Sequence, residues 1–324
     1  MNQSEAKKLS DAFKKAKTIL LTTHRNPDGD GIGSGLALLN RLVKMGKKVD
    51  FVTRDPLPSV YRFLPLSNKI KQLPVVTKKY DLAVFLECPD SDRNGKIFDY
   101  KKYAAVTANV DHHLGNEMYA DINIVDPKAA AVGLQLYRFM KHSGWKLDKD
   151  SAECLYAAIL TDTGSFNYSN TTPAVHEAAA DLLRAGARPA YISSEVYSTS
   201  RQSAALLAAM LSRMQIKEGI GWSMLTRDMF RRTGAADSET DNFINSMRSI
   251  RDVKIAVLFK EFGPQTVKAS FRSKTGFNVN RIAAMFDGGG HKYASGCVIH
   301  KPMKEAVAAV LAAVRKHLYK RSGK

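Results

Sequence analysis

Cysteine is scarce in this chain: there are three, Cys88, Cys154 and Cys297, and none forms a Cys-x-x-Cys pair. An odd number disfavours a disulfide framework and the spacing disfavours a cysteine-based zinc site, so we expect a reducing compartment. The sequence also lacks an apolar run of the roughly 18 residues that a membrane span needs. The first residues contain no apolar segment typical of a secretory signal. We therefore expect a cytoplasmic protein with no membrane partner.

Acidic residues are few relative to basic ones: 31 Asp and Glu stand against 49 Lys and Arg, a formal net charge of +18 over 324 residues. From Tyr191 to the end there are 22 basic and 10 acidic residues, whereas residues 1–190 contain 27 and 21. A basic surplus favours a polyanionic partner such as nucleic acid or a nucleotide, although a solvated lysine-rich surface gives the same count. The asymmetry suggests acids that hold cations in the first part and bases that hold substrate in the second.

The first 190 residues alternate between short apolar runs and amphipathic helical patterns. Near-continuous apolar strands that alternate with helices indicate an α/β domain with a parallel sheet covered on both faces. In such sheets functional residues gather at the carboxyl ends of the strands. We expect strands at 18–23, 49–53, 81–86 and 104–110, and helices at 34–44, 130–142, 151–160 and 172–185.

The pattern changes near Arg188–Pro189, within about ten residues, and a chain of this length suggests about two domains. A helical connection is expected at 191–215. The remainder is typical of a smaller α+β domain, and its final ten residues form a basic tail that we expect to be partly disordered. In this part we expect strands at 221–225, 254–259 and 266–272, and helices at 237–250 and 303–319.

Polar residues with metal-ligating side chains follow the expected strands. Asp28 and Asp30 lie on a glycine-flanked turn after the first strand, where both carboxylates can point toward one place. Together with His24 they suit Mn²⁺ or Mg²⁺, although a capped polar turn has the same residues. Glu87 follows the third strand, and Asp162 lies where a helix is expected to end, as a further ligand or a cap.

The triplet Asp111-His112-His113 ends the fourth expected strand. Alternate side chains point in different directions, so one imidazole can ligate a metal while the other faces a substrate, with Asp111 orienting a ring. In the second part, Arg272 can bind a phosphate with two donors. The run Gly288-Gly289-Gly290 can present backbone N–H groups to an anion, and His291 follows it directly.

The segments HRNPDGDGIGS, DHH, LTDTGSF and GGGH occur in this order and together resemble the DHH phosphoesterase family with a DHHA1 second domain. The resemblance covers nearly the whole chain, and the short length favours the bacterial nano-RNase and pAp-phosphatase branch. It implies a parallel-sheet DHH domain at 1–190, a helical linker at 191–215 and an α+β DHHA1 domain at 216–324. The family consists of manganese enzymes that cleave phosphate esters in the cleft between the two domains.

The resemblance also implies a site with two Mn²⁺ ions, and the residues themselves equally allow Mg²⁺ or Co²⁺. The family has an aspartate as bridging ligand where this chain has Glu87, so either Glu87 or Asp90 is expected to bridge. His113 is expected beside the scissile phosphate, with Asp111 supporting it. The implied ligands are His24 and Asp28 for one metal, and Asp30, His112 and Asp162 for the other. The implied substrate-binding residues are Arg272, Ser273, Gly288, Gly289, Gly290 and His291.

The function that follows from the resemblance is metal-dependent hydrolysis of very short oligoribonucleotides to mononucleotides. Removal of the 3′-phosphate of 3′-phosphoadenosine 5′-phosphate (pAp) is a second expected activity. The partner is short single-stranded RNA or a nucleotide, and the oligomeric state is left open, a homodimer included. Two alternatives stay open: a phosphodiesterase for cyclic or linear dinucleotides, and a non-catalytic nucleotide- or RNA-binding module whose metal site has decayed at Glu87.

Overall fold

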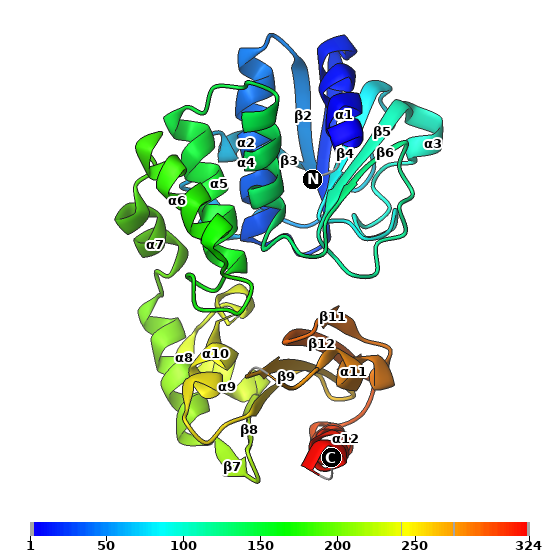
Figure 1. Cartoon of the computed structure of the whole chain (residues 1–324). Coiled ribbons are helices and arrows are strands. Elements are labelled where there is room, and N and C mark those ends of the chain that lie inside the picture. The colour runs from blue at the N-terminus through cyan, green and yellow to red at the C-terminus, as the bar shows by residue number, and fades with distance from the viewer. Residues whose placement is uncertain (1–2, 241, 275, 323–324) are drawn as a thin grey trace. The chain divides into compact units, whose positions relative to one another are not determined.

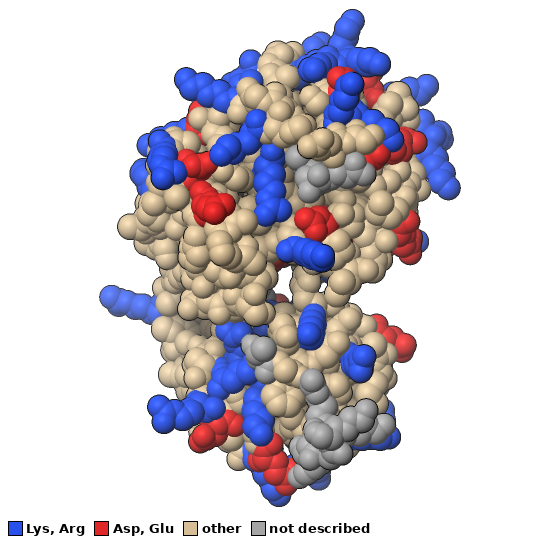
Figure 2. Space-filling view, in the orientation of Figure 1, with Lys and Arg blue, Asp and Glu red and all other residues tan. Residues whose placement is uncertain are grey.

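The computed structural model describes residues 3–240, 242–274 and 276–322. The chain divides into two compact units, Met1–Ser198 and Thr199–Lys324 (Figure 1). None of the described helices is long and apolar enough to cross a membrane. Lys and Arg side chains lie on both units on the face drawn in Figure 2, where Asp and Glu are fewer.

The first unit is built on a sheet in which the described strands lie in the order β3-β2-β1-β4-β5-β6. Each neighbouring pair is parallel, so the predicted α/β class is confirmed. The chain changes direction across the sheet at β1, and open α/β sheets bind ligands at the carboxyl ends of the strands beside such a point. The strands are β1 (Thr18–Thr23), β2 (Lys48–Thr53), β3 (Ile70–Gln72), β4 (Tyr80–Leu86), β5 (Ala104–Asp111) and β6 (Ile122–Val125).

Long helices cover one face of this sheet, as Figure 1 shows for α2, α4 and α5. Side chains alternate along a strand, so Ile19 and Leu21 join the core beneath the helices while Leu20 points to the other face. That other face packs against an irregular segment that contains Ile97 and Phe98. The helices are α1 (Gln3–Lys15), α2 (Gly29–Lys44), α3 (Tyr100–Tyr103), α4 (Val132–His142), α5 (Lys149–Asp162), α6 (Pro173–Arg184) and α7 (Pro189–Val196), with 3₁₀ turns at Ser59–Tyr61 and Ser67–Lys69.

Helix α2 begins at Gly29, earlier than the position 34 that its apolar pattern predicts. Glycine lowers helix propensity, which hides this start in the sequence, but it also allows a close approach. A Cβ on Gly33 would lie 2.4 Å from the carbonyl oxygen of Cys154 on α5. The first turn of α2, which carries Asp30, is therefore packed closely against α5, whose last residue is Asp162.

The helical connection expected at 191–215 is interrupted. Helix α7 ends at Val196, and α8 (Arg201–Ser212) is a separate helix. The hydroxyl of Ser200 accepts from the backbone N–H of Ser203 and so caps α8. Such a capping residue starts a new helix rather than continuing the previous one. The division between the two units, after Ser198, lies in this interruption.

The second unit is built on a mixed sheet with the order β11-β12-β10-β9-β8-β7, in which β8 and β9 are parallel and the other neighbours antiparallel. The predicted α+β class of this part is confirmed. The strands are β7 (Gln215–Lys217), β8 (Ile220–Leu225), β9 (Ile255–Gly263), β10 (Thr266–Ser273), β11 (Gly289–His291) and β12 (Ala294–Ile299). The remaining helices are α9 (Arg227–Thr233), α10 (Phe243–Ser249), α11 (Asn280–Ala283) and α12 (Met303–Ser322), with 3₁₀ turns at Asp237–Glu239 and Ala284–Phe286.

Two expectations for the second unit differ from the structure. The helix expected at 237–250 is a 3₁₀ turn at Asp237–Glu239 followed by α10, with residue 241 outside the described residues. The C-terminal residues continue α12 as far as Ser322, where a partly disordered tail was expected. Buried Val310 and Val314 lie one turn apart on α12 and pack into the core of this unit, which holds the helix on the sheet.

Candidate metal centre

The carboxyl edge of the first sheet brings the predicted acids and histidines together. His24 follows β1, Glu87 follows β4, and Asp111-His112-His113 ends and follows β5. Asp28 and Asp30 come from the start of α2, and Asp162 ends α5. Parallel strands end at the same edge of a sheet, so residues distant in the sequence lie side by side here.

Two groups of potential metal ligands share Glu87. The ligand atoms of His24, Asp28 and Glu87 lie within 4.8 Å of one another, and so do those of Asp30, Glu87 and His112. Glu87 Oε2 is 3.4 Å from His24 Nε2, and Glu87 Oε1 is 3.9 Å from His112 Nε2. The two oxygens of one carboxylate therefore face two different histidines.

Asp162 lies beside the second group, with its Oδ2 3.4 Å from His112 Nε2. Asp90 belongs to neither group, and its Oδ1 instead accepts from the backbone N–H of Asp92 at 2.9 Å. The carboxylate that faces both histidines is thus that of Glu87.

The distances between ligand atoms suit a small divalent cation. Two atoms that each bind one ion at about 2.1 Å lie roughly 3.4 Å apart at a tetrahedral angle and at most ~4.2 Å apart when opposite. The histidine–carboxylate distances in the two groups run from 3.4 to 3.9 Å. Carboxylate oxygens with imidazole nitrogens also form a donor set that Mn²⁺ or Mg²⁺ accepts.

The surroundings of Glu87 fit a bound cation. Its side chain is 2% exposed, and among the described residues its Oε2 has the ion-pair contact with His24 Nε2 at 3.4 Å but no hydrogen bond. A buried carboxylate oxygen without a donor is costly unless a cation pairs with it. Gly31 leaves the space around this oxygen open, because a Cβ there would lie 2.2 Å from Thr23 Oγ1 and 3.1 Å from Glu87 Oε2. The backbone of Glu87 itself has φ +57°, in the left-handed region that a non-glycine residue seldom adopts.

The charges of these groups are strongly perturbed. Burial disfavours the charged imidazole of His24, but the Glu87 and Asp28 carboxylates outweigh it and raise its pKa well above the ordinary value. Burial likewise opposes the ionised form of Glu87, but the neighbouring His24 and His112 hold its pKa well below the usual range. Burial raises the pKa of Asp162 to about 8, and the negative charge of Glu87 adds to this. Acids this crowded are stabilised in their ionised form by a bound cation.

Asp30 is held in place by the start of α4. Its two carboxylate oxygens accept from the backbone N–H of Val132 at 2.6 Å and of Gly133 at 2.8 Å, and Ser34 Oγ donates to it at 3.1 Å. A helix N-terminus stabilises negative charge. Burial and the nearby Glu87 and Asp162 charges nevertheless raise the pKa of Asp30 well above its ordinary value. The backbone of Val132 and Gly133 is a part of the site that the sequence did not reveal.

His113 belongs to neither ligand group: its ring packs edge-on against that of His112, with centroids 5.3 Å apart, and it contacts Asp111. Its Nδ1 lies 2.8 Å from Asp111 Oδ1. Burial opposes the ionised form of Asp111, but the hydrogen bonds from His113 and Asn116 lower its pKa. An ionised carboxylate only accepts, so Nδ1 of His113 is the donor. The side chain of Gln135 also donates to the carbonyl oxygen of Asp111 at 2.8 Å, a contact that no motif predicted.

In the second unit, strand register relates two of the predicted substrate-binding residues. Arg272 on β10 and His291 on β11 both pair with Ala294 on β12. Residues directly opposite on neighbouring strands point to the same face, so Arg272 and His291 share a face of the sheet two strands apart. Ser273 is the next residue on β10 and points to the other face, where its hydroxyl donates to the carbonyl of Phe277 at 2.7 Å. The predicted glycines, Gly288, Gly289 and Gly290, lie immediately before and in β11.

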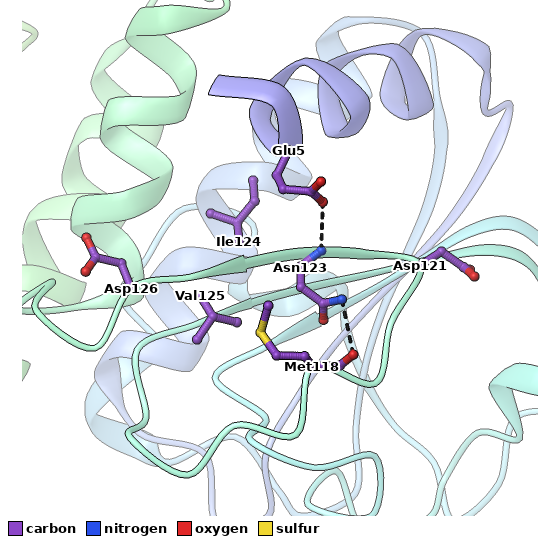
Figure 3. Close-up of a pocket in the computed structure, with 7 residues that line it drawn as sticks. All are labelled: Glu5, Met118, Asp121, Asn123, Ile124, Val125 and Asp126. Atoms are coloured by element: carbon purple, nitrogen blue, oxygen red, sulfur yellow. Dashed lines mark hydrogen bonds between the residues drawn. The ribbon is translucent and has the colours of Figure 1, made fainter. Parts of the chain in front are cut away.

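A pocket of about 370 Å³ lies along β6 (Figure 3). Its lining includes the carboxylates of Glu5, Asp121 and Asp126 and the side chain of Asn123. These groups have structural partners: Asp121 accepts from the hydroxyl of Thr107, and Glu5 from the backbone N–H of Asn123. None of the predicted site residues lines this pocket.

Comparison with known proteins agrees with the architecture of both units. The DHH family N-terminal domain matches residues 18–159, and the DHHA1 domain matches residues 223–320. The bifunctional oligoribonuclease and PAP phosphatase NrnA of Thermus thermophilus is 30% identical over 301 residues, 93% of this chain and 90% of that protein. The protein of the same name from Bacillus subtilis is 29% identical and covers 87% of this chain and 90% of its own length.

Among solved structures, an exopolyphosphatase-related protein from Bacteroides fragilis matches with a TM-score of 0.90 and 26% identity, over 97% of this chain and 96% of that one. The chain belongs to the DHH family and carries a DHHA1 domain as its second domain.

Proposed function

We propose that this protein is a divalent-metal-dependent hydrolase that cleaves very short oligoribonucleotides to mononucleotides and also removes the 3′-phosphate of pAp. The similar proteins of T. thermophilus and B. subtilis, which are named for these two activities, support the proposal. The observation that carries it is the pair of ligand groups that share the carboxylate of Glu87. Two cations with a common ligand are the arrangement that many phosphodiesterases use.

Glu87 is the ligand that would join the two ions, in place of the aspartate of the resembled family. Asp162 would complete the second group beside His112, at the 3.4 Å already noted. Mn²⁺ is the cation we propose, and the same oxygen and nitrogen donors accept Mg²⁺ or Co²⁺. The full proposed ligand set is His24 and Asp28 on one side, Asp30, His112 and Asp162 on the other, and Glu87 between them.

Two bound divalent cations would supply a nucleophilic water at neutral pH and neutralise charge on the phosphoryl oxygens. Among the chain's own residues, Asp111 orients His113 by accepting from its Nδ1, so that the opposite edge of the ring can meet the phosphate. Arg272 and His291 bind another part of the substrate, where a guanidinium offers a phosphate two parallel donors. Ser273 and the backbone of Gly288–Gly290 complete the proposed substrate-binding set. Fixing a short substrate at its end aligns the scissile bond and reduces the entropic part of the barrier.

The test is a substrate panel assayed with metal-stripped protein, with and without Mn²⁺. The panel contains a labelled dinucleotide, a pentanucleotide, a 24-mer, pAp and a cyclic dinucleotide. We expect Mn²⁺-dependent conversion of the two shortest RNAs and of pAp, and no activity in the Asp30→Ala and Asp162→Ala variants. Activity that persists in a chelator would refute the metal dependence. Preference for the cyclic dinucleotide would favour the alternative phosphodiesterase, and binding without turnover would favour a decayed site.

A further inference from the structure

The side chains of Asn116, Asp111 and His113 form a hydrogen-bonded chain of amide, carboxylate and imidazole. The side-chain N–H of Asn116 donates to Asp111 Oδ2 at 2.6 Å, and the other oxygen of Asp111 accepts from His113 Nδ1 at 2.8 Å. Asp111 is fully buried, so solvent does not compete for either oxygen. The backbone closes the same unit into a turn, because the N–H of Asn116 lies 3.4 Å from the carbonyl of His113.

The amide of Asn116 is itself held in one orientation. Its Nδ2 also lies 2.7 Å from Asn109 Oδ1, and its Oδ1 accepts from the backbone N–H of Met118 at 2.8 Å. The amide nitrogen of Asn116 thus faces acceptors and its amide oxygen faces a donor. Rotating the amide by 180° would lose these hydrogen bonds, so its orientation is fixed. Asn109 is fully buried on β5 and is fixed in turn, since its Nδ2 donates to the carbonyls of Phe85 and Cys88.

We propose that Asn116 is a positioning residue, which holds Asp111 so that His113 presents its ring to the phosphate. The proposal rests on the proposed function, in which His113 contacts the substrate. Asn116 acts through Asp111 and is not expected to touch the substrate itself. Outer partners of this kind, which orient the groups that do the chemistry, typically contribute about 10–100-fold to activity.

The metal groups have their own supports, so turnover and metal binding can be separated. The loop after Glu87 is held by the carbonyl oxygen of Cys88. This oxygen accepts hydrogen bonds from Asn109 Nδ2 at 3.0 Å and from the Tyr119 hydroxyl at 3.3 Å, and a longer one from the Asn116 amide at 3.4 Å. The backbone N–H of Glu87 donates to the carbonyl of Val110 at 3.0 Å. Glu87 therefore keeps these contacts when Asn116 is replaced.

The experiment compares Asn116→Ala with a matched control, Asn123→Ala. Asn123 supports the same loop, because its side chain donates to the carbonyls of Met118 (Figure 3) and Ala120, and none of these side-chain bonds involves Asp111 or His113. For Asn116→Ala we expect kcat and kcat/KM on a dinucleotide to fall equally, by about 10–100-fold, as for an interaction made in the transition state. The number of Mn²⁺ ions bound and their affinity stay at the wild-type level, and the control keeps the wild-type kcat.

Asn116→Asp is the second variant, because it keeps the shape of the side chain and lacks the N–H donors. At neutral pH it places a carboxylate where the Asp111 carboxylate needs a donor, and we expect a kcat at least as low as that of the alanine variant. Wild-type kcat in either variant would overturn the proposal, and so would an equal loss of turnover and metal binding. A wild-type protein without Mn²⁺-dependent activity would instead refute the proposed function, so the two failures are distinguishable.

Discussion

Glu87→Asp introduces the residue that the resembled family has at this position, and we expect it to impair metal binding in this chain. Removing one methylene group withdraws the carboxylate toward β4 by about 1.5 Å. The present distances from Glu87 are 3.4 Å to His24 Nε2 and 3.9 Å to His112 Nε2. Each would grow to as much as ~4.9 and ~5.4 Å, beyond the roughly 4.2 Å that two ligands of one small cation can span. Without movement of the backbone we expect the shorter side chain to lose contact with at least one of the two groups.

The expected magnitude follows from losing a direct ligand. Loss of an outer-shell partner weakens metal binding by about 10–100-fold, so loss of the shared ligand should weaken one ion by at least about 100-fold. That factor corresponds to about 2.7 kcal/mol of binding free energy. Because the reaction is proposed to need both ions, kcat should fall with the occupancy of the weaker one.

The assay is calorimetric titration of metal-stripped protein with Mn²⁺, followed by turnover of a dinucleotide at rising Mn²⁺. We expect two ions per wild-type chain and one tightly bound ion in Glu87→Asp. Asp90→Asn is the control, because Asp90 is a nearby carboxylate outside both ligand groups, and it should bind metal as wild type does. Two ions with wild-type affinity in Glu87→Asp, or a lost ion in Asp90→Asn, would refute the reasoning.

Three further predictions concern packing, acid stability and substrate binding. Gly31→Ala places a Cβ 2.2 Å from Thr23 Oγ1. Urea denaturation should show an unfolding free energy lower by about 1–3 kcal/mol, and Mn²⁺ binding should be weaker. An unchanged unfolding free energy together with unchanged Mn²⁺ affinity would contradict this prediction. Burial opposes ionisation of Asp50, but hydrogen bonds from Lys71, Lys78 and Tyr80 lower its pKa. Ionised Asp50 therefore stabilises the fold: this contribution is present above the unfolded pKa of about 3.9 and is lost as the pH falls through the lower pKa of the folded state. The urea midpoints of wild type and Asp50→Asn should accordingly differ at neutral pH and converge in acid. Arg272→Ala should raise KM for a dinucleotide more than it lowers kcat, with Mn²⁺ binding unchanged; a loss confined to kcat would argue against a binding role.

Strands were the part of the fold that local sequence predicted best. The run Thr18–Thr23 is β1 with the same ends, because a strand buried on both faces leaves a continuous apolar signal. Strand β6 (Ile122–Val125) was missed, since an edge strand with alternating burial gives only a short and weak pattern. The interruption between α7 and α8 was missed as well, because Tyr197–Ser200 contains no proline or glycine to mark it.

Only part of the candidate site could be predicted from the sequence. Acids and histidines that follow strands can be located from sequence, and the structure brings His24, Glu87 and His112 together at one edge. That Glu87 and not Asp90 faces both histidines depends on a left-handed backbone, which no local pattern reveals. The supports behind the site, such as Asn116, depend on contacts across strands and loops and are recognisable only in three dimensions.

Asp28 has two roles, and truncating its side chain to alanine removes both of them at once. Its Oδ1 accepts from the backbone N–H groups of Asp30 and Gly31 at the start of α2, and the same oxygen lies 3.7 Å from His24 Nε2. Helix nucleation and ligand placement therefore share one atom, so natural selection on either role constrains the other. Asp28→Ala removes both, whereas Asp28→Asn keeps a capping oxygen and removes only the charge. An inactive alanine variant would consequently report a frayed helix as readily as a lost ligand, and the asparagine variant is the informative one.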